Sequence, residues 1–340
     1  MRKAIFKIQY NDKDITSQFD TRLISLLIID NSGFEADTFS IELSDSDSKL
    51  ALPKRGVELN ISFGWNDDLG LVFNNKFIVD ECEHSGPPDT LTISGKSANF
   101  RESLNVKREQ SYDSITIDKI ACQIAKRHNL KYKIAPELVN QTVNHADQTQ
   151  ESDASFLTRI LSDYDAIATV KNGMLIIFLS GSTKTVSGKI LPHVVINRSS
   201  GDRHSFSIAD REAYTGTKAY WLNFRKAEFS SSASGSTNSD DKSVLVGAEG
   251  NVKVLRHTYS SKQNAYRAAK NQWKKLQRGA CQFSMTLAQG RPDLFPEMPL
   301  RVQGFKQEID SSEWIITRCI HSITAEGGFV TSLELEIKLD

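Results

Sequence analysis

The chain has 340 residues, a length that predicts about two to three domains rather than one core. Hydrophobic residues make up 39% and charged residues 25%, which excludes wholesale disorder. Forty-two basic residues balance forty-two acidic ones, so no strong long-range field attracts nucleic acid or an anionic membrane, and subunits can pack against one another without repulsion.

The N-terminal segment, MRKAIFKIQYND, does not have the pattern of a signal peptide, because Lys7 and Gln9 interrupt the apolar run. The longest apolar stretches, residues 26–29 and 175–179, are far shorter than a membrane span. Four cysteines lie far apart and form no C-x-x-C pair, which is typical of free thiols made in a reducing cytoplasm. The sequence therefore predicts a protein that is neither exported by an ordinary signal nor anchored.

Short strands dominate the first hundred residues. Apolar and polar side chains alternate along residues 39–43 and 57–63, a period of two that places one face on a core and the other in water. Turn residues separate the strands, as at residues 85–89. This pattern favours antiparallel barrels or sandwiches.

Three segments have helical periodicity instead, namely residues 116–130, 152–164 and 261–279. Thr116 is placed to cap the first helix, and serines open the other two. Between the second and third helices, residues 229–243 are rich in Ser, Gly, Asn and Asp without an apolar period, which predicts a mobile surface loop or a linker.

The end of the chain repeats an early segment. Residues 77–85 (FIVDECEHS) and 314–322 (WIITRCIHS) share an aromatic residue, two β-branched residues, a cysteine and a His-Ser pair, and each is followed by a turn and an alternating strand. The matching positions are Phe77 with Trp314, Val79 with Ile316, Cys82 with Cys319, and His84 with His321. We therefore expect two copies of one β-domain, and three such chains would form a ring of six similar faces.

The order of these elements resembles that of the phage late-control D family, the baseplate hub proteins of contractile-tailed phages, which are related to the hub part of type VI secretion spikes. The matching stretches span nearly the whole chain: residues 77–104, 114–130, 148–177, 259–279 and 294–338. One departure is Pro296-Glu297-Met298-Pro299, where the family commonly has a Pro-Gly turn, so the loop entering that strand is expected to differ.

The resemblance implies a virion structural protein of the tail baseplate, assembled in the host cytoplasm of an infecting phage, a prophage or a derived injection device. Its implied partners are a second and third copy of itself in a homotrimer, the tail-tube protein, the spike protein and other baseplate proteins. The implied ring adapts a hexameric tube to a trimeric spike and is wide enough to pass DNA, without sequence-specific nucleic acid binding. No spike segment follows Asp340, so we expect the spike to be a separate polypeptide.

The resulting fold prediction is a mainly β protein with α insertions, built from two similar antiparallel, tube-like β-barrel domains and a small mixed region. We expect the first barrel in residues 1–105, an α/β insertion with two helices in residues 106–200, and the second barrel in residues 201–340. The second barrel would carry the loop 229–243 and the helix 261–279, and the barrel boundaries can be discontinuous.

Two kinds of chemistry remain as alternatives to a purely structural role. Two Cys-His pairs, Cys82 with His84 and Cys319 with His321, can in principle supply a tetrahedral zinc site, but packed cysteines and hydrogen-bonded histidines are the better interpretation. A β-rich peptidoglycan hydrolase or glycan-binding module would use carboxylate pairs and tryptophan platforms. No G-x-S-x-G or H-E-x-x-H motif occurs, and we predict no enzyme activity, cofactor or metal.

Overall fold

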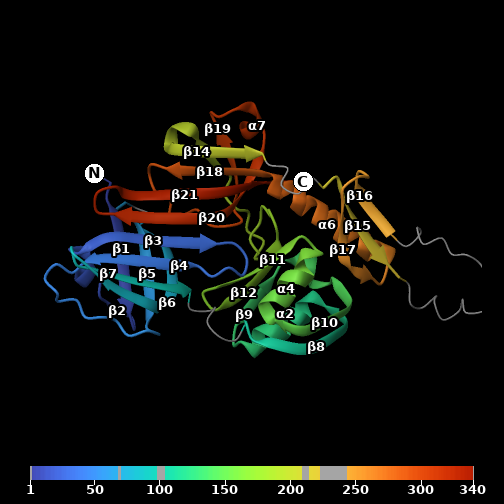
Figure 1. Ribbon diagram of the computed structural model, residues 1–340, viewed down its shortest axis with the longest axis horizontal. Coiled ribbons are helices and arrows are strands. Elements are labelled where there is room, and N and C mark those ends of the chain that lie inside the picture. The colour runs from blue at the N-terminus through green and yellow to red at the C-terminus, as the bar shows by residue number, and fades with distance from the viewer. Residues whose placement is uncertain (1, 68–69, 98–103, 209–213, 223–242, 340) are drawn as a thin grey trace, which may run out of the picture.

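Thirteen strands join into one continuous sheet that takes strands from both ends of the chain (Figure 1). The computed structural model describes residues 2–67, 70–97, 104–208, 214–222 and 243–339. The Ser-rich segment 229–243, predicted to be a mobile loop, lies outside the described residues except for Ser243. The fold is mainly β with α insertions, as predicted.

The first half of the sheet contains seven strands in the order β3-β4-β7-β6-β5-β1-β2. Their bounds are β1 (Ala4–Tyr10), β2 (Lys13–Asp14), β3 (Leu23–Asn31), β4 (Thr38–Ser44), β5 (Glu58–Trp65), β6 (Leu71–Ser85) and β7 (Thr90–Ser97), with the short helix α1 (Ser17–Asp20) after β2. Alternating residues of these strands, among them Ile41, Ile61 and Phe77, are buried in one core.

The second half has the strand order β14-β18-β21-β20-β19-β13. Its elements are β13 (Val194–Asn197), the 3₁₀ turn η2 (Arg198–Ser200), β14 (Gly201–Ile208), β18 (Cys281–Leu287), β19 (Pro299–Gln303), α7 (Gln307–Asp310), β20 (Glu313–Thr324) and β21 (Gly328–Ile337). Trp314 is fully buried in its core, and its indole N–H donates to the carbonyl of Ile309 at 3.1 Å.

The two halves repeat one strand order, with β1, β3, β4, β5, β6 and β7 corresponding to β13, β14, β18, β19, β20 and β21. Both central hairpins carry a bulge at the same place, since Asp80 is skipped between β6 and β7 and Thr317 between β20 and β21. The first strand is the exception, because β1 runs antiparallel to β5 whereas β13 runs parallel to β19. The segments matched in the sequence thus hold corresponding places in the two halves.

The predicted division into two barrels is not confirmed. Within the described residues no hydrogen-bonded ladder closes either half, and the halves instead merge where β20 pairs with β3. Ile323 and Phe329 of the second half even pack into the first core. The expected boundary between two self-contained barrels is therefore replaced by one curved sheet with two cores.

Residues 104–179 form a separate α/β body with its own core, here called the middle unit. It contains β8 (Lys107–Thr116), α2 (Ile117–Arg127), β9 (Lys131–Ile134), α3 (Pro136–Val139), β10 (Thr142–Ser152), α4 (Asp153–Ser162), β11 (Ala166–Lys171) and β12 (Met174–Leu179). The hydroxyls of Thr116 and Ser152 accept from backbone N–H groups at the starts of α2 and α4. Both predicted helices are therefore present with the predicted caps.

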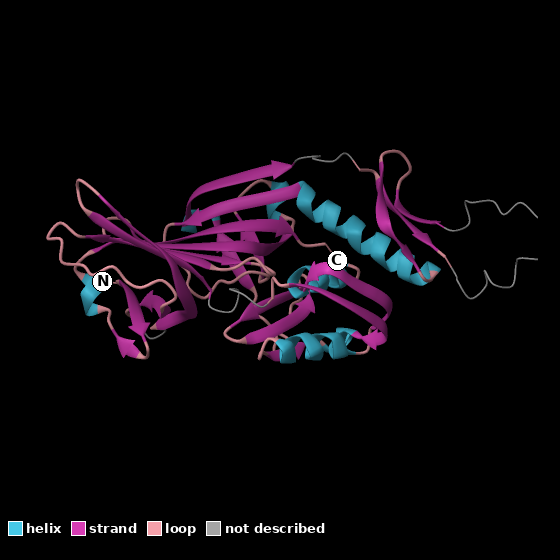
Figure 2. Ribbon diagram, turned by 60° about the horizontal axis from the view of Figure 1, so that its bottom comes forward, coloured by secondary structure: helices cyan, strands magenta, loops and turns pink. Residues whose placement is uncertain are grey.

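The insertion between β14 and β18 is a three-stranded sheet, β16-β15-β17, with a long helix against one face (Figure 2). Its elements are β15 (Gly216–Trp221), β16 (Ser243–Gly247), β17 (Val252–Tyr259) and α6 (Lys262–Ala280), which starts at the predicted Ser261 cap. Ala265 and Ala269 of α6 pack on Ala219 and Val244 of the sheet. None of the described helices is long and apolar enough to span a membrane.

Candidate functional site

The two halves meet along β20 and β3, a contact that we call the joint. Antiparallel pairing runs from Arg318 opposite Asn31 to Thr324 opposite Ser25. The Arg318 guanidinium donates to the Asn31 side-chain oxygen at 2.8 Å, and the backbone N–H of Ser32 donates to the carbonyl of Thr317 at 3.2 Å. The joint therefore combines a strand ladder with polar side-chain contacts at one end.

Glu297 reinforces the joint from an unusual backbone conformation. Its φ is +70°, and its N–H donates to the carbonyl of Ile316 at 2.7 Å. Gly56 has the same role in the first half, with φ +87° and an N–H that donates to Val79 at 2.8 Å. Unlike glycine, Glu297 carries a carboxyl group, which contacts the Ser32 hydroxyl. Burial raises the pKa of Glu297.

Each of the two strand edges that form the joint has a counterpart elsewhere in the chain. These counterpart edges have no strand partner among the described residues. The counterpart of β3 is β14, whose outer edge is unpaired, and the counterpart of β20 is β6, which pairs with β5 only as far as Ile78. Glu81, Glu83, His84 and Ser85 of β6 are exposed, as is most of β14, and Ile208 at its end is 66% exposed. Unpaired strand edges are templates for another chain.

Most of the residues singled out by the sequence repeat are core residues. Phe77 and Val79 are buried in the first half, and Trp314, Ile316 and Cys319 in the second. Cys82 is half-buried, with its thiol 3.6 Å from the carbonyl of Pro53. The side chain of His84 is 43% exposed and lies 3.4 Å from Asp45.

The two Cys-His pairs do not meet, because β6 and β20 are separated in the sheet by β3, β4 and β7. The described part of the chain contains no cluster of three or more Cys, His, Asp or Glu residues placed to hold a metal ion. Trp65 and Trp314, considered as sugar platforms, are buried and donate to backbone carbonyls.

His321 is a buried histidine within the joint, where it lies opposite Ile28. Its ring packs against Phe63 at 5.1 Å between centroids, and Nδ1 lies 3.0 Å from the Thr331 hydroxyl. Burial lowers its pKa to about 4, although Asp293 acts in the opposite direction. The folded protein therefore holds this ring neutral.

His321 predicts a loss of stability in acid. The folded-state pKa lies below the ordinary value, so its contribution is complete above about pH 6.5 and is lost as the pH falls towards about 4. The full loss is on the order of 3 kcal/mol. Urea unfolding between pH 7 and pH 4 should show a shallower decline for the double variant His321→Phe/Thr331→Val than for the natural protein.

The exposed repeat partner of His321 gives the matched control for the substitution itself. His84→Gln changes a side chain that is 43% exposed and should alter the stability at pH 7 by no more than about 0.5 kcal/mol. Equal profiles for the natural protein and the His321 double variant would show that this ring does not govern acid stability.

A buried charge cluster attaches the middle unit to the first half. The Lys171 ammonium, at the end of β11, lies 2.6 Å from the Asp30 carboxylate and 2.5 Å from that of Asp37. Asn75 donates to the second oxygen of Asp37 at 3.0 Å. Burial raises the pKa of Asp30 to about 6 even beside the lysine. This cluster was not predicted from the sequence. Its only sequence signal is that Asp30 and Lys171 each lie at the end of an apolar strand.

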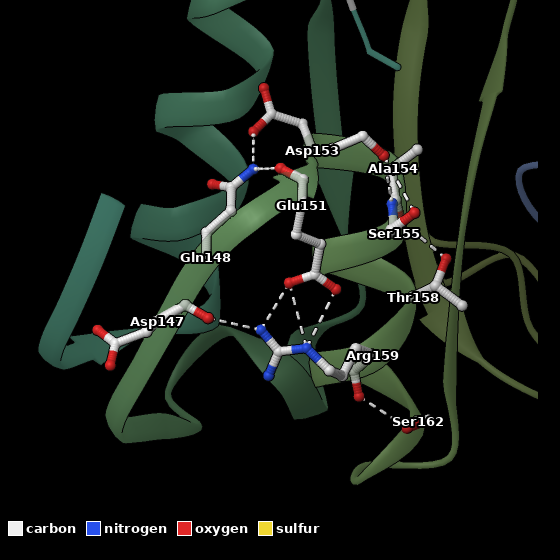
Figure 3. A network of polar contacts seen from close by, with 10 residues as sticks. Asp147, Gln148, Glu151, Asp153, Ala154, Ser155, Thr158, Arg159 and Ser162 are labelled. Carbon is white, nitrogen blue, oxygen red and sulfur yellow. Dashed lines mark hydrogen bonds and ion pairs between the residues drawn. The ribbon is translucent and has the colours of Figure 1, made fainter. Parts of the chain in front are cut away.

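Figure 3 shows the polar network that organises the middle unit around α4. Asp153, with no exposed surface, accepts from Arg127 at 2.7 Å, from Gln148 at 2.8 Å and contacts His128 at 2.7 Å. Although burial alone would raise it, these hydrogen bonds hold the pKa of Asp153 below its ordinary value. Arg159 forms an ion pair with Glu151 at 2.7 Å nearby.

Comparison with known proteins connects this architecture to phage tails. Residues 35–327 match the family described as phage tail baseplate hub (GPD). A relative from Escherichia phage 186, described as a probable baseplate hub protein, is 44% identical over 363 residues and covers 98% of this chain and 93% of the relative.

Two solved structures share the fold at low sequence identity. The 43 kDa tail protein of prophage MuSo2 from Shewanella oneidensis aligns with a TM-score of 0.72 at 12% identity, over 98% of each chain. The Escherichia coli c3393 protein, a component of the type VI secretion system, aligns with a TM-score of 0.53 at 11% identity, over 94% of this chain and 74% of that one.

Proposed function

Because the chain belongs to the phage tail baseplate hub family and is a structural tail component rather than an enzyme, we propose that three copies close into a ring that adapts a sixfold tail tube to a threefold spike. The hydrolase alternative is set aside, since the family and its relatives are structural baseplate proteins.

The observation that carries the proposal is that each chain contains one paired joint, between β20 and β3, and the two corresponding strand edges, of β6 and β14, left unpaired. If β14 of one copy pairs with β6 of the next, every copy offers one unpaired surface to each neighbour, a heterologous contact that closes by rotation. Three chains then have three joints within chains and three between them. The result is a ring of threefold symmetry with six similar faces.

The register of the joint can be carried over to the contact between copies. β3 pairs Ile28 with Phe39 of β4, and β14 pairs Phe206 with Phe283 of β18. Within the chain, Cys319 lies opposite Asp30. Between copies, the corresponding pair is Cys82 with Ile208, and Glu83 then lies opposite Ser207. This pairing buries the exposed Ile208 side chain.

The ring is tested by measuring the mass of the protein in solution together with a variant of the unpaired edge. The natural chain should have three times its 38.0 kDa. Ile208→Lys should stay a folded monomer, because a charge would enter the contact between copies. The matched control Ile190→Lys changes a residue that is 72% exposed on the linker after β12, and it should still form the trimer. A trimer undiminished by Ile208→Lys contradicts the proposed pairing.

A disulfide gives a direct test of the register. Glu83→Cys with Ser207→Cys should join neighbouring copies under mild oxidation, because residues opposite one another on adjacent strands have Cβ atoms about 4.5–5.5 Å apart. Each single cysteine variant serves as the control. Dimers and trimers on a denaturing gel are expected only from the double variant, and an uncrosslinked double variant counts against this register.

In the proposed baseplate the ring contacts the tail-tube protein on one side and the spike and other baseplate proteins on the other, and DNA passes through its lumen after the spike leaves. Assembly takes place in the host cytoplasm. The separate cores support three units close to the expected 1–105, 106–200 and 201–340, except that Val194 and Ile196 belong to the core of the second half and the first core is completed by residues of the second half.

A further inference from the structure

A cavity of about 450 Å³ lies between the middle unit, the first half and the loop that contains Glu297. Apolar atoms make up most of its exposed lining surface, to which Phe73, Met174, Ile176, Phe178 and Phe295 contribute beside a larger number of polar residues. Phe295, at 41% exposure, stands where the cavity meets solvent. Both the volume and this apolar lining are those of ligand pockets, which span about 300–1,000 Å³.

Two residues that line the cavity each have a buried side-chain oxygen without a hydrogen-bond partner within the described residues. Thr169, only 8% exposed, has a buried hydroxyl without a partner, and one carboxyl oxygen of Glu297 is buried in the same way. Buried polar groups are nearly always hydrogen-bonded in native protein structures. Both atoms lie beneath the cavity's surface, so recognition of an occupant has to come from the apolar lining and from the charged edge.

The charge of the cavity's edge is positive. Lys133 of β9 and Lys184 of the following linker both line the cavity and are exposed, and neither has an ion pair in the ranges that the structure describes. Two acidic residues also line the cavity: Asp30 is paired with Lys171, and Glu297 contacts the Ser32 hydroxyl. An occupant with acidic residues beside an apolar side chain would complement both the walls and the edge.

We propose that this cavity receives an acidic polypeptide segment of a tail partner, anchored by one or two large apolar side chains. The apolar anchors fill the space among the phenylalanines, and the flanking carboxylates pair with Lys133 and Lys184. A buried anchor in a preformed pocket surrounded by a polar rim is the usual arrangement of a binding hot spot.

Two synthetic peptides test the proposal on the full-length protein, acetyl-EEFLEE-amide and its lysine-flanked counterpart acetyl-KKFLKK-amide, each with a fluorescent label. The acidic peptide should bind with one site per chain and at least roughly tenfold tighter than the basic one. Lys133→Glu/Lys184→Glu should weaken the acidic peptide roughly tenfold and favour the basic one. The control Lys131→Glu/Lys189→Glu changes exposed lysines that do not line the cavity and should bind normally.

Absence of saturable binding, or equal affinity for the two peptides, overturns the proposal. Loss of peptide binding in step with trimer formation overturns it as well, because the occupant would then be a second copy of the chain. The inference is independent of the ring, so the monomeric Ile208→Lys variant should bind the acidic peptide as the natural protein does. The solution mass therefore tests the proposed ring, and peptide binding separately tests the proposed pocket.

Discussion

Replacing Lys171 with methionine is expected to destabilise the protein by about 3–5 kcal/mol, because two buried carboxylates lose their shared cation. Asp30 and Asp37 each lie within 2.6 Å of the ammonium group and are themselves almost fully buried. Methionine fills a similar volume but cannot compensate either charge. Urea unfolding and hydrogen exchange at the contact between the middle unit and the first half measure the loss.

The pH dependence of this variant has a definite sign. Without the lysine the folded-state pKa of Asp30, already raised by burial, rises further, so stability is lost as the pH rises, and the penalty should be larger at pH 8 than at pH 5. The triple variant Lys171→Met/Asp30→Asn/Asp37→Asn should recover a large part of the loss, since it removes the uncompensated charges. The control Lys189→Met, at an exposed linker position, should be within about 0.5 kcal/mol of the natural protein. A Lys171→Met variant as stable as that control would contradict this account.

Asp153→Ala should destabilise the middle unit by about 3–5 kcal/mol. The change leaves the guanidinium of Arg127 and the amide of Gln148 without their carboxylate, and it removes the contact with His128, whose side chain is only 1% exposed. The middle unit, residues 104–179, contains no tryptophan, so hydrogen exchange of α2 and α4 is the appropriate local measurement.

Asp118 gives the matched comparison, since it occupies the first turn of α2 as Asp153 does that of α4. Asp118→Ala removes mainly a helix-dipole interaction and should cost at most about 1 kcal/mol. Similar losses from both variants would show that the Asp153 network adds nothing beyond its position at a helix start.

Local features of the fold were predictable from the sequence. The three helices start after Thr116, Ser152 and Ser261, where the sequence predicts them, because a capping hydroxyl acts within three residues. The third helix extends to Ala280, one residue beyond the predicted Gly279, and β18 begins directly after it. The repeated segments 77–85 and 314–322 also lie in corresponding hairpins, β6–β7 and β20–β21. This was predictable because the alternation of apolar residues and the position of the cysteine are visible within one short segment.

Features that depend on distant pairings were not predictable in the same way. Lys171 meets Asp30 and Asp37 across 141 and 134 positions of sequence, so no local pattern relates them. The two halves merge into one sheet because β20 pairs with β3. The sequence does not predict this pairing, since an alternating strand pattern is the same in a closed barrel and in an open sheet. The sequence likewise does not distinguish a buried histidine such as His321 from an exposed one such as His84.

The turn at Glu297 makes the two kinds of strand contact in the proposed ring different: the joint within each chain and the corresponding contact between chains, each called a seam. A homohexamer must repeat the same side chains at every seam, whereas a trimer of duplicated chains can specialise alternate ones. Here a carboxyl group braces the seam inside each chain, and Gly56 has no side chain with which to do so at the seam between chains. Under load the ring should part between chains first, releasing intact two-lobed subunits with their internal seams still closed.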